Sequence, residues 1–474
     1  MSLDHIDALV AQLAAIVGPE QVSSKKVDLL AHSFDATQHH FAADIVVHPG
    51  STAEVAAIVQ IAARHKIPIL ARGAGSGFTG GALPIHGGIV LVLTRMDRIL
   101  EIDTDNLIAV VEPGVVTAAL QNEVEKLGLF YPPDPASKAF STLGGNVAEC
   151  AGGPRCLKYG VTRDYVLGLT VVTPKGDVLH TGGRTMKNVV GYDLTRLIVG
   201  SEGTLGIVTQ IILRLLPKPA AKKTMLATFI SIHHAAKAVS AIIQAKIIPV
   251  TLEFMDASAI DCVRQQPGIN LPAECQALLL LEVDGDIDQL DSQLNRIVTV
   301  IKPLGLVAST IAHTSDEAEA IWQVRRSVSP SLRRLGPNKF NEDVVVPRSK
   351  LPTMLEMLDD IGKRYQVPIV NFGHAGDGNI HVNVMVDLKE PGMSEKIRQV
   401  LEEIFRATVS LGGAISGEHG IGTAKQPYIA LELDPPTLAA MRAVKLAFDP
   451  DNIMNPGKMF PAAAPAAQAS VALS

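Results

Sequence analysis

The sequence is poor in cysteine and contains no long apolar run. Its four cysteines, Cys150, Cys156, Cys262 and Cys275, match neither a zinc-finger spacing nor a CxxC motif. No segment approaches the ~20 consecutive apolar residues that a membrane span requires. These absences predict a cytoplasmic protein, which could still dock at the inner membrane through a partner.

Basic residues do not gather into a stripe that could follow a phosphate backbone. The formal net charge is −6, and no Lys/Arg cluster is interleaved with aromatic side chains. The residues up to Gly18 show helical spacing of apolar side chains, without a basic start or a small-residue cleavage site. We therefore expect neither a nucleic-acid partner nor a cleaved signal peptide.

The chain is longer than one hydrophobic core can organise. A length of 474 residues with 47% hydrophobic content predicts a globular protein of two or three domains. The segment 215–223 contains two prolines and a basic cluster, and it interrupts the pattern of strands and helices. We therefore place the domain boundary after residue 218.

The first domain is predicted to begin with a βαβ unit and a glycine-rich loop. A strand from residue 45, a helix over 53–65 capped by Ser51 or Thr52, and a strand over 67–72 precede a GxGxxG motif at 75–80. In a Rossmann fold this motif opens a helix, but here a new strand, 89–93, follows. The loop is therefore interpreted as a nest of backbone amides for phosphate oxygens, with a plain hairpin connection as the alternative.

The glycine-rich loop is the first of several such segments. Residues 141–148, 152–153, 187–193 and 200–207 repeat the composition. A single loop of this kind would be weak evidence, but the series predicts an extended ligand that lies across many loops.

The second domain is predicted to alternate short strands with long helices. Strands are expected over 224–230, 249–255, 277–283 and 368–372, and helices over 233–245, 287–301, 315–335 and 351–365. This order is typical of an antiparallel sheet backed by helices, that is, an α+β domain.

The most informative stretch is the segment 373–381 with its partner 417–420. Two strands joined by Gly-Asp-Gly-Asn can aim His374 and His381 into one cavity, and Glu418 and His419 lie in a second glycine-bounded turn. One histidine beside a sheet is usually a hydrogen-bonded core residue. The whole set instead predicts a metal site with a base.

The ordered series of motifs resembles the flavoenzymes of the vanillyl-alcohol oxidase type. Among them it is similar to the 2-hydroxyacid dehydrogenases that include the D-type chain of glycolate oxidase, D-lactate dehydrogenase and D-2-hydroxyglutarate dehydrogenase, over residues 44–460. The resemblance implies an α+β fold with a two-part FAD-binding domain at 1–218 and an antiparallel-sheet cap domain with the metal site at 219–425. A C-terminal segment, 426–474, then packs back on the FAD domain and ends in a mobile tail from about residue 461.

The resemblance also implies the cofactors and their ligands. The metal ligands are His374, His381 and Glu418, with zinc expected first and manganese or iron as alternatives, and the base is His419. The residues expected to hold FAD are Arg72, Gly73, Ala74, Gly75, Ser76, Gly77, Pro133, Thr142, Gly144, Gly145, Asn146, Gly152, Gly153, Tyr159, Glu202, Gly206, Ile207 and Asn455.

The resemblance also implies three residues that contact the substrate, and their chemistry and spacing agree with this. Arg325 offers the bidentate guanidinium that a carboxylate requires, and Ser329 follows it by one helical turn. Asn383 lies two residues beyond His381 and therefore on the same side of the strand.

The implied reaction is the oxidation of a D-2-hydroxy acid to the 2-oxo acid by hydride transfer to flavin N5. D-Lactate, glycolate and D-2-hydroxyglutarate share the recognised head group. The electron acceptor could be a quinone, a cytochrome, an iron–sulfur subunit or an electron-transferring flavoprotein, and the protein could form a homodimer or a hetero-complex. The alternative is a flavin subunit of a multi-subunit electron-transfer complex that is active only with its partners.

The flavin is predicted to be bound without a covalent link. Related enzymes often attach FAD through a histidine of the phosphate loop, and residues 73–77 contain none. Precipitation with acid should therefore leave yellow flavin in the supernatant, because unfolding removes every contact that holds it. Flavin colour retained in the washed precipitate would contradict this prediction.

Overall fold

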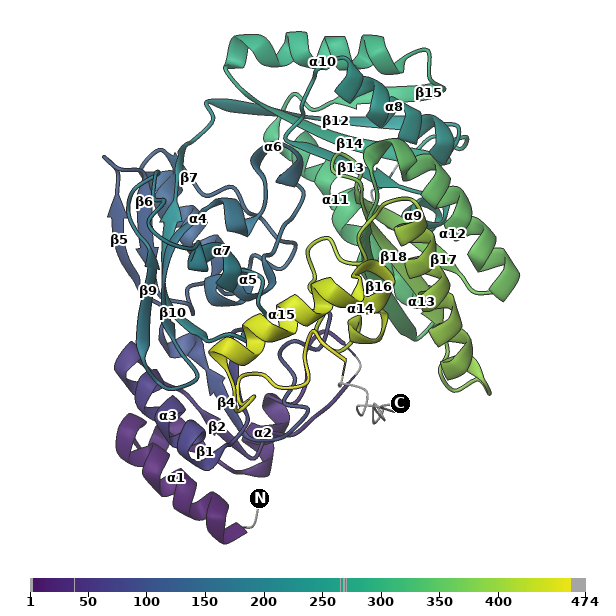
Figure 1. Ribbon diagram of the computed structural model, residues 1–474. Coiled ribbons are helices and arrows are strands. Elements are labelled where there is room, and N and C mark those ends of the chain that lie inside the picture. Colours follow the sequence, from purple (N-terminus) through teal and green to yellow (C-terminus); the bar gives the residue numbers. More distant parts are fainter. Residues whose placement is uncertain (1–2, 38, 265, 267–268, 270, 462–474) are drawn as a thin grey trace, which may run out of the picture.

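The computed structural model describes residues 3–461 except 38, 265, 267–268 and 270. Figure 1 shows an amino-terminal part in purple and blue, a second part in teal and green, and the yellow C-terminal helix α15 (Pro435–Phe448) between them. The predicted mobile tail lies almost entirely in 462–474, outside the described residues. Within the described residues, no helix combines the length and the apolar character needed to cross a bilayer.

The first part begins with a small sheet of four strands. Its order is β1 (Val22–Ser23), β2 (Ile45–Val47), β4 (Ile89–Val92) and β3 (Ile69–Arg72), and β4 pairs in parallel with β2 and β3. Helices α1 (Leu3–Val17) and α3 (Thr52–His65) share its core. The predicted cap is confirmed, because the Ser51 hydroxyl accepts the N–H of Glu54 at 3.2 Å.

A second, antiparallel sheet completes the amino-terminal part. Its order is β5 (Ile99–Asp103), β6 (Ile108–Val111), β10 (Ile207–Arg214), β8 (Val166–Val172) and β9 (Val178–Gly182). The shorter elements of this half are α2 (Lys26–Ala31), α4 (Thr117–Lys126), β7 (Leu129–Phe130), α5 (Leu143–Glu149), α6 (Cys156–Tyr159), α7 (Leu194–Ile198) and β11 (Leu216–Pro217). The glycine-rich residues 73–81, 152–153, 187–193 and 200–206 lie in loops between these elements, whereas Gly144 and Gly145 belong to α5.

The second part is built on a seven-stranded antiparallel sheet, which confirms the predicted α+β architecture. Its order is β15 (Leu306–Ile311), β12 (Ala221–Phe229), β14 (Ala277–Gly285), β13 (Thr251–Met255), β17 (Ile369–His374), β18 (Asn379–Val386) and β16 (Asn338–Val345). One face packs against α8 (Ile232–Gln244), α10 (Ile287–Ile301), α12 (Leu351–Tyr365) and α13 (Met393–Ser410). These helices lie on the side away from the amino-terminal part (Figure 1).

The opposite face of this sheet carries the polar residues. Helices α9 (Ala257–Arg264) and α11 (Ser315–Ser331) cover part of it with a separate hydrophobic cluster. Because side chains alternate between the faces of a strand, Glu253, Asp343, His374, His381 and Asn383 all project from this face. The strand pairings alone therefore gather residues that lie far apart in the sequence.

Two details of the second part differ from the prediction. The helix expected over 315–335 ends at Ser331 and continues as a 3-10 turn, Leu332–Arg334. Strands β15 and β16 and helix α9 were not predicted. Strand β16 has the sequence Asn-Lys-Phe-Asn-Glu-Asp-Val-Val, and its alternate polar residues face the site rather than solvent, so it lacks the apolar pattern of a buried strand.

The chain returns to the first part after α14 (Ile429–Glu432) and α15. The backbone N–H of Ile69 donates to the Ile453 carbonyl at 2.8 Å, and the N–H of Asn455 donates to the Ile69 carbonyl at 2.8 Å, which extends the edge of the small sheet. The buried carboxylate of Asp449 holds this return, because it accepts the N–H groups of Ile453 at 3.0 Å and Met454 at 2.8 Å.

Replacement of Asp449 is predicted to weaken this return. In Asp449→Ala the N–H groups of residues 453 and 454 lose their acceptor and the Lys445 ammonium loses its ion pair, which should cost about 2–4 kcal/mol. Asp451→Ala is the matched control, since Asp451 forms only an exposed pair with Lys66 and should cost under about 1 kcal/mol. Urea unfolding followed by fluorescence or circular dichroism measures both; equal midpoints for the two variants would contradict the prediction.

Candidate active site

The two predicted histidines lie on one hairpin. His374 ends β17, His381 lies in β18, and the turn between them closes with a hydrogen bond from the Gly378 N–H to the His374 carbonyl at 3.2 Å. Gly378 adopts a φ of +89°, and a Cβ there would lie 2.0 Å from the Val346 carbonyl oxygen. The tight turn therefore requires glycine at this position and aims both imidazoles at one point.

The structure brings the three predicted metal ligands together. The Nε2 atoms of His374 and His381 are 3.3 Å apart. Glu418 Oε1 lies 3.4 Å from Nε2 of His374 and 3.6 Å from Nε2 of His381. Ligand atoms about 2.1 Å from a tetrahedrally coordinated ion are about 3.4 Å from one another. These three atoms therefore fit a divalent metal and leave a fourth direction for another ligand.

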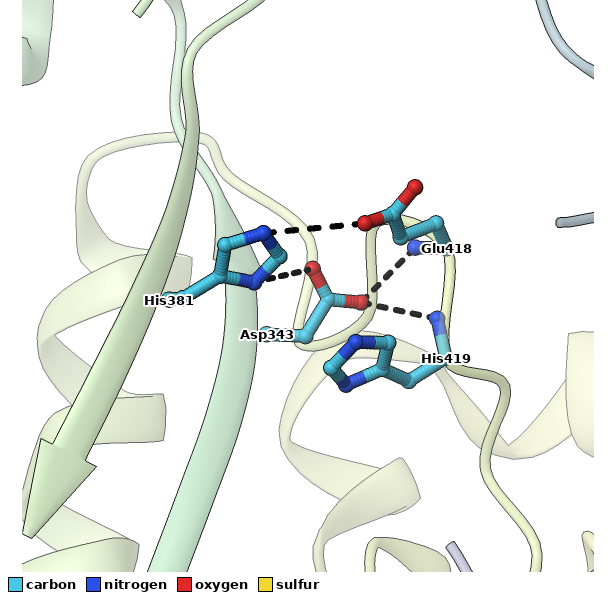
Figure 2. A group of neighbouring side chains, drawn as sticks. All are labelled: Asp343, His381, Glu418 and His419. Atoms are coloured by element: carbon cyan, nitrogen blue, oxygen red, sulfur yellow. Dashed lines mark hydrogen bonds and ion pairs between the residues drawn. The ribbon is translucent and has the colours of Figure 1, made fainter. Parts of the chain in front are cut away.

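A second acidic residue, Asp343, belongs to the same cluster and was not predicted. Figure 2 shows it with His381, Glu418 and His419, whose potential ligand atoms lie within 4.8 Å of one another. Its Oδ2 accepts the N–H groups of Gly417 at 2.8 Å, Glu418 at 2.7 Å and His419 at 2.9 Å. Because its Oδ2 already accepts these three bonds, Asp343 shapes the turn that presents Glu418 and His419. Beside His381 and Glu418, His374 is therefore a better third metal ligand than Asp343.

The charge of Asp343 is favoured by its surroundings. Burial would raise its pKa, but His419, Lys425 and His381 together hold the pKa well below its ordinary range. The Lys425 ammonium is almost completely buried and donates to the Asp343 carbonyl at 3.0 Å. Asp343 is therefore a carboxylate at physiological pH.

The predicted base, His419, lies in a stack of three rings. Its ring is 5.0 Å from Phe78 of the glycine-rich loop at an interplanar angle of 26°, and 5.5 Å from His381 at 13°. Burial lowers the pKa of His419, although the charge of Asp343 opposes this shift. Its Nδ1 has no hydrogen-bond partner among the described residues. A neutral imidazole with an unused nitrogen can accept a proton.

The glutamate Glu253 was also not predicted. Its Oε1 pairs with Nδ1 of His374, and its Oε2 accepts from Nε of Arg325 at 2.7 Å. Burial would raise the pKa of Glu253, but His374 and Arg325 hold it below the ordinary value. Burial likewise would lower the pKa of His374, whereas Glu253 and Glu418 raise it well above the ordinary value. The sequence signal that could have identified Glu253 is a single acidic residue within the otherwise apolar strand β13.

Of the three predicted substrate residues, Arg325 and Ser329 line the cavity beside the cluster. The Ser329 hydroxyl accepts a hydrogen bond from Lys339 Nζ at 3.0 Å. The third residue, Asn383, is fully buried and does not line the cavity. Its side-chain amide donates to the carbonyls of Val370 at 3.2 Å and His381 at 2.9 Å. Its neighbour Asn341 on β16 does line the cavity.

One cavity of about 590 Å³ joins this cluster to the glycine-rich loops of the first part. A Cβ at Gly73 would lie 2.1 Å from Thr142 Oγ1, so the bare backbone forms a cradle that a side chain would fill. The predicted flavin residues that line the cavity are Arg72, Gly73, Ala74, Gly75, Ser76, Gly77, Thr142, Gly144, Gly145, Asn146, Gly152, Glu202 and Gly206. The loops and the cavity fit an extended cofactor such as FAD.

Five predicted flavin residues do not line the cavity. These are Pro133, Gly153, Tyr159, Ile207 and Asn455. The Tyr159 hydroxyl donates to Asp284 at 2.6 Å, and the Asn455 amide donates to the carbonyls of Gly81 at 2.9 Å and Glu202 at 2.8 Å. Asn455 therefore supports the cavity loops from behind.

Comparison with known proteins finds two matching family models. The model described as FAD linked oxidases, C-terminal domain, matches residues 218–459, and the model described as FAD binding domain matches residues 43–182. Among solved structures, substrate-bound p-cresol methylhydroxylase has a TM-score of 0.81 at 20% identity, covering 97% of both chains. A 4-ethylphenol oxidase from Gulosibacter chungangensis has a TM-score of 0.78 at 20% identity, covering 97% of this chain and 98% of its own. These two share the fold.

Curated relatives are similar over most of their length. A glycolate oxidase subunit GlcD from Bacillus subtilis is 47% identical over 450 residues, which is 95% of this chain and 96% of the relative. A D-lactate dehydrogenase from Anaerostipes hadrus is 35% identical, over 88% of this chain and 89% of its own. A D-2-hydroxyglutarate dehydrogenase from Stutzerimonas stutzeri is 34% identical, over 96% and 99%.

Replacement of Asp343 is predicted to disrupt the turn that presents Glu418 and His419. Asp343→Ala leaves three N–H groups without their acceptor and removes the carboxylate charge beside the buried Lys425, which should cost about 3–5 kcal/mol. Asp377→Asn is the control, because that carboxyl accepts a single N–H, from Asn379 at 3.2 Å, and should cost under about 1 kcal/mol. The midpoint of chemical unfolding reports both, and a tolerated Asp343→Ala would contradict the role of Asp343.

Proposed function

The chain belongs to the family of FAD-linked oxidases, and on that premise we propose that it oxidises a D-2-hydroxy acid to the corresponding 2-oxo acid. The substrate class rests on the relatives named D-lactate dehydrogenase, D-2-hydroxyglutarate dehydrogenase and glycolate oxidase subunit. A divalent metal is proposed at His374, His381 and Glu418, and FAD is proposed in the adjoining cavity.

The observation that carries the proposal is the ligand triangle next to the stacked base. Three ligand atoms at mutual distances of 3.3–3.6 Å share one cavity with His419, Arg325 and the glycine-rich loops. A 2-hydroxy acid presents a carboxylate and a hydroxyl on adjacent carbons, so a metal and a guanidinium side by side can hold its head group.

The cofactors would supply two functions that amino-acid side chains lack. A bound divalent metal lowers the pKa of a coordinated hydroxyl, and bound FAD accepts a hydride at N5. The reaction then removes one proton and one hydride from the substrate. Zinc is proposed first, with manganese or iron as alternatives, because two imidazoles and a carboxylate suit each of them.

The residues of the chain supply positioning and the base. The neutral His419 accepts the proton of the substrate hydroxyl, and Asp343 stabilises the imidazolium that results. The Nη groups of Arg325, which are not used by Glu253, bind the substrate carboxylate. Burial of His374, His381 and Asp343 limits the access of water to the cluster and strengthens these interactions.

Anaerobic bleaching of the flavin tests the proposed function. The purified flavoprotein is mixed with the D and L forms of lactate and 2-hydroxyglutarate, and with glycolate. Loss of the flavin absorbance is expected with D-2-hydroxy acids, and a chelator should abolish it until zinc or manganese is restored. Absence of bleaching with the whole panel would overturn the proposal for the isolated chain.

Replacement of the base is predicted to separate flavin binding from chemistry. His419→Gln should retain FAD but lower the rate of bleaching by roughly 10²–10⁴-fold, because no group accepts the hydroxyl proton. His233→Gln, on the exposed side of α8, is the control. In the wild type, kcat/KM should fall only below pH 6.5, since burial lowers the pKa of His419 from that value. Unchanged bleaching in His419→Gln would discard the assigned base.

A second candidate function is that of a flavin subunit that works only with partners. Relatives from Bacillus subtilis and Escherichia coli are both named as subunits of glycolate oxidase. Size-exclusion chromatography of the native material, followed by a dye-linked assay of the isolated chain, tests this candidate. A single-chain peak or homodimer that turns over with the dye would reject it. If a hetero-complex is found, its other subunits identify the route to the electron acceptor. The candidate acceptors are a quinone, a cytochrome, an iron–sulfur subunit and an electron-transferring flavoprotein.

A further inference from the structure

We propose that Glu253 is a positioning residue that ties the metal site and the substrate-carboxylate site together through one buried carboxylate. The inference rests on the proposed function. It assigns a role to a residue that neither the sequence motifs nor the ligand set includes. It also predicts that the two binding sites fail together when this one side chain is changed.

Glu253 lies in the middle of β13, between β14 and β17, where water does not reach. Its exposed fraction is 0%, and all five residues of β13 are buried. An isolated carboxylate at such a place is strongly unfavourable, so the fold must provide partners for it. Both oxygens have one, His374 Nδ1 and Arg325 Nε respectively.

The first contact determines the tautomer of His374. An ionised carboxylate only accepts hydrogen bonds, so Nδ1 of His374 must carry the hydrogen. The lone pair of a neutral imidazole then lies on Nε2, which faces the Nε2 of His381 and Glu418 Oε1. A carboxylate behind a metal-binding histidine orients the ring and increases the basicity of the coordinating nitrogen.

The second contact determines the direction of Arg325. Its Nε–H is bound to Glu253, and its guanidinium lies over the ring of Phe372 with the central carbon 4.6 Å from the ring centre. These two contacts fix both the plane and the rotation of the guanidinium. Among the described residues Arg325 makes no other hydrogen bond, and it lines the cavity, so its Nη groups are available to a carboxylate there.

A neutral side chain cannot serve both partners. The amide of glutamine has a single acceptor oxygen, and its nitrogen is a donor that would face either His374 Nδ1–H or Arg325 Nε–H. One of the two side chains would lose its orientation, and the ring of His374 could rotate or change tautomer. A carboxylate is therefore required at this position for both sites at once.

The test compares Glu253→Gln with Asp256→Asn. Asp256 follows β13, accepts the N–H of Asn371 on β17 at 2.7 Å, and touches neither site. Asp256→Asn therefore replaces a carboxylate by an amide next to the same two strands, as Glu253→Gln does. Each flavoprotein is stripped of metal, and the affinity for Zn²⁺ is measured by calorimetry. The affinity for oxalate, a carboxylate that is not oxidised, is then measured from the flavin spectrum.

In Glu253→Gln, the Zn²⁺ affinity should fall roughly 10–100-fold. The oxalate affinity should fall about 10-fold or more, even at a Zn²⁺ concentration that saturates the variant. Asp256→Asn should leave both affinities within about threefold of the wild type, because it alters neither partner of Glu253. A purely structural role for Glu253 would lower the unfolding midpoint of Glu253→Gln and leave the two affinities unchanged.

A second variant keeps the test decisive if Glu253→Gln does not fold. Glu253→Asp retains the charge but is one methylene shorter, so it cannot reach both partners and should weaken both affinities to a smaller extent. If Glu253→Gln keeps either affinity within threefold of the wild type, or if Glu253→Asp leaves both affinities unchanged, the inference is overturned. A wild-type protein that binds no metal and is not bleached by any 2-hydroxy acid would overturn the proposed function instead.

Discussion

The carboxylate of Asp343 is the contact on which the arrangement of the site depends. It accepts three consecutive backbone N–H groups, so the turn of residues 417–419 can adopt only one position relative to β16. Strand β16 pairs with β18 over its whole length, with Asp343 directly opposite His381. The position of Glu418 and His419 relative to His381 is therefore set by a sheet register and one buried charge, and not by the flexible length of the loop.

The same turn is attached to the amino-terminal part on its other side. The N–H groups of Ile421 and Gly422 each donate to Glu202 at 2.7 Å, and the N–H of Thr423 donates to the Thr79 carbonyl at 2.8 Å. Phe78, from the same glycine-rich loop, stacks on His419. His419 is therefore held between the two halves of the molecule, where a cofactor in the loops would meet a ligand of the cluster.

Three histidines within one small volume have pKa values shifted for different reasons. Glu253 raises the pKa of His374, while burial and the charge of His374 lower that of His381, and burial lowers that of His419. Asp343 opposes the last two shifts without reversing them. The three rings therefore differ in their protons: Glu253 holds a proton on Nδ1 of His374, whereas His381 and His419 are neutral.

The sequence alone determined the helices and turns that patterns of neighbouring residues encode. The helices over 287–301 and 351–365 were predicted with their observed bounds, because their apolar residues recur at helical spacing. The hairpin of His374 and His381 followed from a glycine-rich turn between strands. Only the tertiary structure decided the contributions of Glu253 and Asp343. Each is a single acidic residue in a strand. The partners of Glu253 lie 72 and 121 positions further along the chain, and the turn that Asp343 holds lies 74 to 76 positions further along. Long-range strand pairing creates such contacts, and no spacing along the chain records them.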